Sequence, residues 1–361
     1  MRPEAPQMKA LRLKSWKSEP VLENVPVPEP GPGEVLVQVG AAGACHSDLH
    51  LMHDFEDAAL PWQPPFTLGH ENAGWVHRVG QGVTGLEPGD PVAVVGAWGC
   101  GACRRCLDGL ETYCERPDLA PVPSGGGGLG LDGGMAEYLL VPAARHVVPL
   151  PEGLDPVDAA PLTDAGLTPY HAVRRSAAKL TPGSTAVVMG VGGLGHLAVQ
   201  ILTATTAARV IAVDPRGSAR DLATECGAEC VLAPGPDLVP EIRDATDGLG
   251  ADVVLDMVGS DETLAAAAAS MRPLGDLTIV GLGGGTLPVS FFGLPYEASV
   301  QTTYWGNRRE LVEVLALAAR GLLRPETTIY TLDDAAQAYR DLAHETVTGR
   351  AVVVPTDSYR G

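Results

Sequence analysis

Aromatic and basic side chains are scarce in this chain of 361 residues, and long apolar runs are missing. Phe, Trp and Tyr make up only 5 %, so a core must be built from Val, Leu, Ile and Ala. Lys and Arg number 25 against 44 Asp and Glu, a formal net charge of −19. Such a surface repels phosphate backbones and anionic lipid, which argues against nucleic acid or a membrane surface as partner.

No stretch approaches the roughly 18–20 consecutive apolar residues that cross a bilayer. Residues 1–16 (MRPEAPQMKALRLKSW) also lack the apolar run of a signal peptide. The expected location is therefore the cytoplasm, where the seven cysteines favour metal binding or catalysis over disulfides.

The sequence pattern changes near residue 159, from short β-type runs to alternating strands and helices. This change and the length of the chain predict two domains. Upstream, short β-type runs are bounded by Gly, Pro and Asp. They lie at 34–39, 73–79, 91–95 and 137–141. The glycine-rich segment 124–134 predicts a flexible loop rather than a phosphate-binding turn, because it neither follows a strong strand nor opens a helix.

Downstream, buried-type strands alternate with Ala-rich helical segments, as in a doubly wound parallel sheet. The strands are expected at 186–189, 210–213, 251–256 and 276–280. A helix at 311–320, a helix opening at 333–334 and a strand at 351–354 complete the chain.

Four cysteines within fifteen residues, Cys100, Cys103, Cys106 and Cys114, have the spacing of a closed zinc site. Four thiolates leave no open coordination position, so this zinc is predicted to be structural. The lobe that holds it is expected at about residues 96–118.

A glycine motif predicts a dinucleotide site. The strand at 186–189 leads into Gly190-x-Gly192-x-x-Gly195 and a helix, and Asp214 follows nineteen residues after Gly195. In this pattern Gly190 makes the tight turn, Gly192 lets backbone amides approach a pyrophosphate, and Gly195 allows close packing of helix and strand. The turn also contains Gly193 and Leu194.

Asp214 is expected to accept the ribose hydroxyls of the cofactor and to repel a 2′-phosphate, which favours NAD over NADP. Arg216 lies close enough in sequence to weaken that preference.

A third pattern is dispersed: Cys45-His46-Ser47-Asp48-x-His50 and, further on, Gly69-His70-Glu71. Cys and His are good zinc ligands, and a catalytic zinc takes three protein ligands and keeps one open position. Taken alone, however, the spacing does not distinguish Cys45 and His70 as ligands from core packing.

These motifs, in this order, resemble the zinc-dependent medium-chain alcohol dehydrogenase family over essentially the whole chain. The segment DAGLTPYHA (164–172) and the pair Tyr304–Trp305 are most similar to bacterial NAD-dependent secondary-alcohol dehydrogenases. The resemblance implies a GroES-like β-barrel catalytic domain, residues 1–160 and 310–361, and a Rossmann NAD-binding domain, residues 161–309. It also implies a homotetramer or dimer, for which the region 276–303 offers edge strands.

The resemblance implies that Cys45 and His70 are two ligands of a catalytic zinc. Most members carry a second cysteine where this chain has Asp164. A carboxylate binds zinc at about 2.0–2.2 Å and carries the same charge as a thiolate, so Asp164 remains the expected third ligand. The alternative is that Asp164 lies behind the ligands while Glu71, the acid beside the ligand histidine, coordinates the metal. Asp48 is expected to orient His70 through its far ring nitrogen.

The implied activity is hydride transfer between NAD and secondary alcohols or ketones. Ser47 takes the hydroxyl proton, which passes over the cofactor ribose to His50 and then to solvent. His46 is expected to face the pyrophosphate, and Trp62, Tyr304 and Trp305 to line the substrate pocket. Alternatives are a polyol dehydrogenase, in which Glu71 ligates zinc, and a primary-alcohol or aldehyde reductase. A non-catalytic dinucleotide-binding protein is disfavoured because the ligand and relay residues are present.

Overall fold

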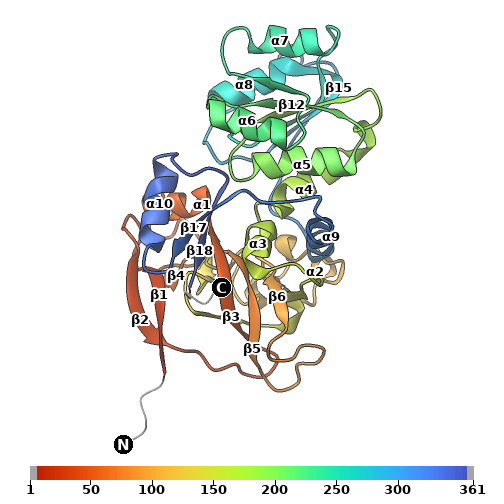
Figure 1. Cartoon of the computed structure of the whole chain (residues 1–361). Coiled ribbons are helices and arrows are strands. Elements are labelled where there is room, and N and C mark those ends of the chain that lie inside the picture. The colour runs from red at the N-terminus through yellow and green to blue at the C-terminus, as the bar shows by residue number, and fades with distance from the viewer. Residues whose placement is uncertain (1–5, 356–361) are drawn as a thin grey trace, which may run out of the picture. The chain divides into compact units, whose positions relative to one another are not determined.

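The computed structural model describes residues 6–355, which divide into two compact units. The first contains the chain up to Ala165, the segment Trp305–Ala319 and the chain from Thr327 onward. The second contains Gly166–Tyr304 and Arg320–Glu326 (Figure 1). The domain limits expected at 160 and 310 lie a few residues from these divisions. Their outer ends, and the start of the N-terminal segment read for a signal peptide, lie outside the described residues.

The first unit is mostly β-structure. A seven-stranded sheet has the order β10-β6-β5-β3-β18-β17, with β9 also paired to β3, and a three-stranded sheet has the order β2-β1-β4. The strands are β1 Gln7–Leu13, β2 Val21–Pro26, β3 Val35–Ala44, β4 Phe66–Thr67, β5 Glu71–Val79, β6 Pro91–Val94, β7 Gly126–Gly127, β8 Gly130–Leu131, β9 Tyr138–Val141, β10 Val147–Pro149, β17 Thr327–Thr331 and β18 Arg350–Val354. Their inward faces form a core rich in Val, Leu and Ala, as the scarcity of aromatics requires.

Short helices connect and cover these strands. They are α1 His46–His53, α2 Arg104–Leu107, α3 Pro156–Ala159, α9 Arg308–Ala319, α10 Ala335–Ala343 and the 3-10 turns η1 Glu111–Tyr113, η2 Pro117–Leu119, η3 Ala144–His146 and η4 Ala160–Thr163.

Strand register gathers three distant segments at one end of the large sheet. Gly43 of β3 pairs with Glu71 of β5, and Ala44 pairs with Ala351 of β18. Consequently Cys45, which follows β3, lies near both the start of β5 and the start of β18. Gly43 is required here, because a Cβ on it would lie 1.8 Å from the Glu71 Oε2.

The glycine-rich segment 124–134 is not the flexible loop that its composition predicts. Its residues 125–128 and 133–134 are buried. Gly134 N–H donates to the Gly69 carbonyl at 2.9 Å, and a Cβ on Gly133 would lie 2.3 Å from that oxygen. The glycines therefore permit close backbone packing against the residue that precedes His70.

The second unit is a parallel six-stranded sheet covered by helices. The strand order β13-β12-β11-β14-β15-β16 is, in chain order, the 3-2-1-4-5-6 arrangement of the dinucleotide-binding fold. Its elements are β11 Thr185–Met189, β12 Arg209–Val213, β13 Cys230–Leu232, β14 Ala251–Asp256, β15 Met271–Ile279, β16 Ser299–Thr302, α4 Leu167–Arg175, η5 Ala177–Lys179, α5 Gly195–Thr205, α6 Gly217–Glu225, α7 Leu238–Ala245 and α8 Asp261–Ser270. Among the described residues, no helix has the length and apolar character needed to cross a membrane.

Candidate active site and zinc centres

Cys45, His70 and Asp164 converge in the first unit, and one donor atom from each lies within 4.8 Å of the other two. His70 Nε2 and Asp164 Oδ2 are 3.5 Å apart. Two ligands of a tetrahedral zinc, each bonded at about 2.0–2.2 Å, lie about 3.3–3.6 Å apart. The spacing and the thiol, imidazole and carboxylate donors therefore fit a three-ligand zinc site, with Cys45 and His70 buried and Asp164 partly exposed.

Asp48 orients the ring of His70. Its Oδ1 lies 3.0 Å from His70 Nδ1, and its Oδ2 accepts hydrogen bonds from the Tyr339 hydroxyl at 2.9 Å and the Cys45 N–H at 3.2 Å. With the proton on Nδ1, Nε2 presents a lone pair toward Cys45 and Asp164. Burial lowers the pKa of His70, but Asp48 and Asp164 raise it well above its ordinary value. The same negative field favours a bound cation.

Glu71 is held by a buried arginine from the last strand. Arg350 donates from Nε and Nη2 to the two carboxylate oxygens at 2.9 and 2.6 Å, and Ala165 N–H donates to Oε1 at 3.0 Å. Burial raises the pKa of Glu71 to about 7, against the opposing charge of Arg350. Both oxygens are engaged, so the geometry favours Asp164 over Glu71 as the third donor beside Cys45 and His70.

The other residues of the Cys45–His50 motif lie on α1. Ser47 Oγ is 3.5 Å from His70 Nε2, which places this hydroxyl beside the three donors. His50 is partly exposed and its Nδ1 contacts Asp54 Oδ2, which fixes the orientation of the imidazole. His46 is exposed.

The three residues expected to line the pocket lie in different surroundings. Trp305 is 5 % exposed, stands edge-on to His70 with ring centroids 5.6 Å apart, and donates from Nε1 to the Thr163 carbonyl at 3.0 Å. It therefore packs against one donor residue and fixes the backbone before another. Trp62 lies in an aromatic cluster with Trp16 and Phe66. Tyr304 is 44 % exposed and belongs to the second unit.

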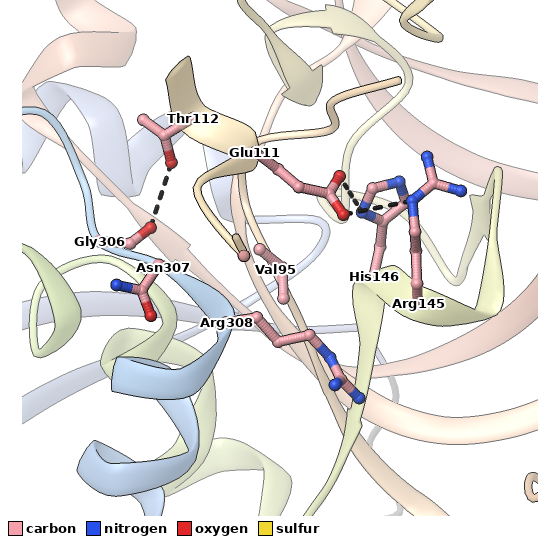
Figure 2. A pocket seen from close by; sticks show the side chains of 9 residues that line it. Val95, Glu111, Thr112, Arg145, His146, Gly306, Asn307 and Arg308 are labelled. Carbon is pink, nitrogen blue, oxygen red and sulfur yellow. Dashed lines mark hydrogen bonds and ion pairs between the residues drawn. The ribbon is translucent and has the colours of Figure 1, made fainter. Parts of the chain in front are cut away.

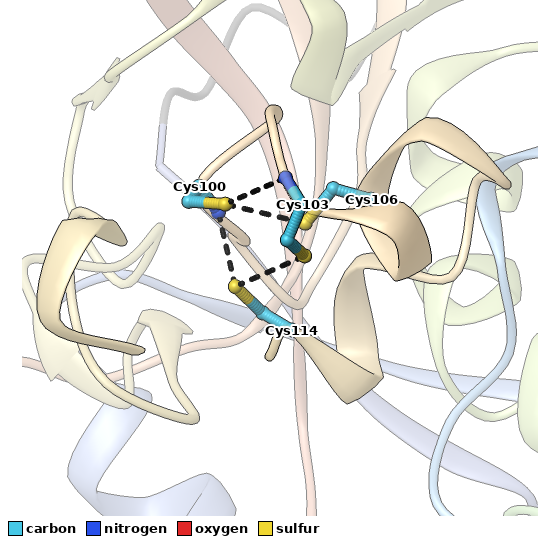
Figure 3. A group of neighbouring side chains, drawn as sticks. All are labelled: Cys100, Cys103, Cys106 and Cys114. Atoms are coloured by element: carbon cyan, nitrogen blue, oxygen red, sulfur yellow. Dashed lines mark hydrogen bonds between the residues drawn. The ribbon is translucent and has the colours of Figure 1, made fainter. Parts of the chain in front are cut away.

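The four-cysteine lobe has the geometry of a closed zinc site (Figure 3). The Sγ atoms of Cys100 and Cys106 are 3.9 Å apart, and those of Cys103 and Cys114 are 4.0 Å apart. A tetrahedron with Zn–S bonds of about 2.3 Å places its sulfurs about 3.8 Å apart. Backbone N–H groups lower the pKa of Cys100 and lower that of Cys103 to about 6, whereas burial raises the pKa of Cys106 and Cys114.

A small pocket lies at the edge of this lobe, and hydrogen bonds made by its lining residues hold the backbone at Gly99 (Figure 2). It is lined by Val95, Gly109, Glu111, Thr112, Arg145, His146, Gly306, Asn307 and Arg308. Three of these, Gly109, Glu111 and Thr112, belong to the lobe, and none is a predicted zinc ligand. Glu111 accepts from Gly99 N–H at 2.9 Å, and Arg145 donates to the Gly99 carbonyl at 2.7 Å and to Glu111 at 3.2 Å. Burial lowers the pKa of His146 to about 3, so this ring is neutral.

In the second unit, each of the three motif glycines has the local geometry that its role in a dinucleotide-binding turn requires. Gly190 has φ +87°, a conformation that side chains disfavour. A Cβ on Gly195 would lie 1.9 Å from the Gly190 carbonyl oxygen, so helix and strand pack tightly there. A Cβ on Gly192 would meet nothing closer than Arg216 Nη2 at 4.0 Å, which leaves this turn accessible to a ligand. Gly193 and Leu194 complete the turn before α5 begins at Gly195.

Asp214 directly follows β12, the strand that neighbours β11. It accepts from Val191 N–H at 2.8 Å and from Arg216 N–H and Nε at 2.9 and 3.1 Å. Burial opposes its ionisation, but these hydrogen bonds lower the pKa of Asp214 below its ordinary value. The anionic carboxylate and the Arg216 guanidinium therefore lie together beside the glycine turn.

Sequence reasoning missed Arg350 and Tyr339. Both lie far from the other site residues in the chain, in β18 and α10. An arginine at the start of an otherwise apolar strand, and a tyrosine on the buried side of an amphipathic helix, were available signals. Neither identifies its partner without the pairing of β18 with β3.

Comparison with known proteins agrees with this geometry. The family model "Alcohol dehydrogenase GroES-like domain" matches residues 31–152, and "Zinc-binding dehydrogenase" matches residues 193–320. The NAD-dependent alcohol dehydrogenase of Sulfurisphaera tokodaii is 37 % identical over 96 % of this chain and 100 % of its own length. The D-arabinose 1-dehydrogenase (NADP(+)) of Saccharolobus solfataricus is 33 % identical over 96 % of this chain and 97 % of its own.

Among solved structures, the alcohol dehydrogenase of Aeropyrum pernix superposes with a TM-score of 0.88 at 38 % identity, covering 96 % of this chain and 100 % of that one. The chain therefore belongs to the zinc-dependent medium-chain alcohol dehydrogenases and is an NAD-dependent oxidoreductase. The predicted family and the predicted fold class, a GroES-like domain with a Rossmann domain, are confirmed.

Proposed function

We propose that this enzyme interconverts secondary alcohols and ketones at a zinc held by Cys45, His70 and Asp164. The observation that carries the proposal is the convergence of these three donors, with Asp48 orienting the histidine. The preference for secondary alcohols rests on the resemblance of residues 164–172 and 304–305 to the secondary-alcohol subgroup.

The chain supplies the groups that position the substrate and move its proton. When bound, zinc supplies a Lewis acid for the alcohol oxygen and NAD supplies the hydride acceptor. Ser47, whose hydroxyl lies beside the three donors, relays the alcohol proton by accepting it while giving up its own hydroxyl proton toward His50. His50, three residues further along α1 and partly exposed, releases a proton to water. Trp305 and Trp62 provide aromatic surface for the apolar part of the substrate, and the family resemblance adds Tyr304 as a pocket residue.

A second candidate is oxidation of an aldose or polyol. A relative named D-arabinose 1-dehydrogenase, 33 % identical, favours keeping this possibility. The polyol alternative in which Glu71 ligates zinc is disfavoured, because Arg350 and Ala165 occupy both of its oxygens.

A panel assay with a zinc count tests both candidates. NADH formation is followed with 2-alkanols, matched primary alcohols, sorbitol and D-arabinose, and zinc is measured in the same protein. The proposal predicts a zinc ion at each of the two donor groups and the highest kcat/KM with 2-alkanols. Turnover confined to sorbitol or D-arabinose would replace it with the second candidate, and zinc in the cysteine lobe alone would overturn the assignment of Cys45, His70 and Asp164.

We further propose that NAD binds over the turn formed by Gly190, Gly192, Gly193, Leu194 and Gly195, with its adenosine ribose on Asp214. The buried, ionised Asp214 would repel a 2′-phosphate, while Arg216 would attract one. His46 is proposed to face the pyrophosphate.

Asp214→Asn tests this assignment, because it removes the charge and keeps an oxygen for the Val191 N–H. We expect the ratio of kcat/KM with NADP to kcat/KM with NAD to rise about 10- to 100-fold, since a like-charge contact costs several kcal/mol. Arg216→Gln is the opposite control and should lower the ratio. An unchanged ratio in Asp214→Asn would remove Asp214 from the cofactor site.

We propose that the enzyme is a cytoplasmic homotetramer. β16 is the edge strand of its sheet, and the segment before it exposes a cluster of apolar side chains. These are Leu282, Val289, Phe291, Phe292 and Tyr296, each more than 60 % exposed. A second copy paired along β16 would cover them, and a tetramer would join two such pairs. Light scattering on the purified chain tests the mass. None of the seven cysteines forms a disulfide, which suits a reducing compartment.

A further inference from the structure

A tyrosine hydroxyl from the C-terminal part of the chain reaches the carboxylate behind the zinc-binding histidine. Tyr339 lies on α10, is 2 % exposed, and donates from Oη to Asp48 Oδ2 at 2.9 Å. Asp48 itself is 0 % exposed. Burying a phenol hydroxyl costs free energy unless the hydroxyl is hydrogen-bonded. The hydrogen bond to Asp48 satisfies this group and is therefore part of the site's structure.

The two oxygens of Asp48 have separate tasks. Oδ1 faces His70 Nδ1 at 3.0 Å, whereas Oδ2 receives Tyr339 and, at the longer distance of 3.2 Å, Cys45 N–H. If the phenol were removed, Oδ2 would retain only the longer of its two hydrogen bonds. The carboxylate plane, and with it the His70 ring, would then be less well fixed.

We propose that Tyr339 is a positioning residue of the catalytic zinc site, acting through Asp48 to aim His70 Nε2 at the metal. This inference rests on the proposed zinc site at Cys45, His70 and Asp164. Groups that hold the far nitrogen of a ligand histidine set both its orientation and its basicity, and changing them typically weakens metal binding about 10- to 100-fold. Tyr339 is one hydrogen bond further away, so its effect should be smaller.

Tyr339→Phe removes the hydroxyl and keeps the ring. We expect zinc at Cys45, His70 and Asp164 to bind about three- to tenfold more weakly in competition with a chelator, because the orienting group is loosened. The cysteine-lobe zinc, measured in the same sample, should be unchanged. Co²⁺ loaded into the catalytic site should also show a shifted visible spectrum.

The chain offers a matched control. Tyr330 of β17 donates to Asp341 Oδ2 on the same helix α10, also at 2.9 Å, with no hydrogen bond to Asp48. Tyr330→Phe therefore deletes a tyrosine–aspartate hydrogen bond of the same length in a more exposed setting, and should leave both zinc affinities and the Co²⁺ spectrum as in the wild type.

A double variant separates positioning from packing and gives a second test. In an Asp48→Asn background, the loss from Tyr339→Phe should shrink to less than twofold, because the residue acts through the carboxylate. Wild-type affinity and an unshifted Co²⁺ spectrum in Tyr339→Phe would overturn the inference, as would an undiminished loss in the double variant. A wild-type chain that holds zinc only in the cysteine lobe would refute the proposed zinc site itself, and the inference with it.

Discussion

Asp164→Ala should release the catalytic zinc and leave the zinc of the cysteine lobe in place. Two remaining ligands, Cys45 and His70, do not complete the three-ligand site that a catalytic zinc needs. The lost Lewis acid is worth several kcal/mol in the transition state, so kcat/KM should fall about a thousandfold or more. Zinc content by mass spectrometry or atomic absorption, beside the alcohol assay, measures both effects.

Asp164→Cys is the matched control. The family resemblance implies a cysteine at this position, and a thiolate has the same charge as a carboxylate with a bond to zinc only slightly longer. This variant should keep the full zinc content and a substantial part of the activity. An Asp164→Ala protein with undiminished zinc and activity would show that another residue completes the site, and Glu71 would be the first to test.

Local sequence patterns were sufficient to predict the fold. The first unit consists mainly of short strands bounded by Gly, Pro and Asp, and the second alternates buried strands with helices. The expected strands at 186–189, 210–213 and 251–256 coincide within a residue with β11, β12 and β14. The helix expected at 311–320 overlaps α9. The prediction of a flexible loop for the glycine-rich segment 124–134 was wrong, because flexibility was inferred from composition alone. Its glycines instead allow close approach to Gly69, a tertiary requirement that composition does not reveal.

The candidate site could be predicted where the residues have distinctive chemistry and lie close together in the chain. It could not be predicted where its contacts join residues far apart in the chain. The cysteine spacing indicated the lobe directly, since its four thiols lie within a few turns of each other. Cys45, His70 and Asp164 needed a family resemblance, because they are separated by long stretches of chain. Neither approach identified the partners of Tyr339 and Arg350, because their roles follow from strand pairing and helix packing that join the C-terminal part of the chain to β3 and α1.

Arg350→Met should destabilise the first unit by about 3–5 kcal/mol. The Glu71 carboxylate is 0 % and the Arg350 side chain 3 % exposed, so the variant leaves a buried carboxyl that has lost its countercharge and keeps only the hydrogen bond from Ala165 N–H. Removing one partner of a buried ion pair costs this much, although the intact pair adds little over an apolar substitute. Trp16, Trp62, Trp75, Trp98 and Trp305, all the tryptophans of the chain, lie in the first unit. Urea unfolding followed by tryptophan fluorescence, with zinc in excess, therefore reports on this unit.

Two variants give this prediction its contrast. Arg78→Met breaks the ion pair between two exposed side chains of the same unit, Arg78 and Glu29. It should cost no more than about 1 kcal/mol. Adding Glu71→Gln to Arg350→Met should recover most of the loss, because no uncompensated charge then remains buried. If Arg350→Met were as mild as Arg78→Met, the buried pair would not be a strong restraint on Glu71. The case for Asp164 over Glu71 as the third zinc ligand would then rest on the distance between Asp164 and His70 alone.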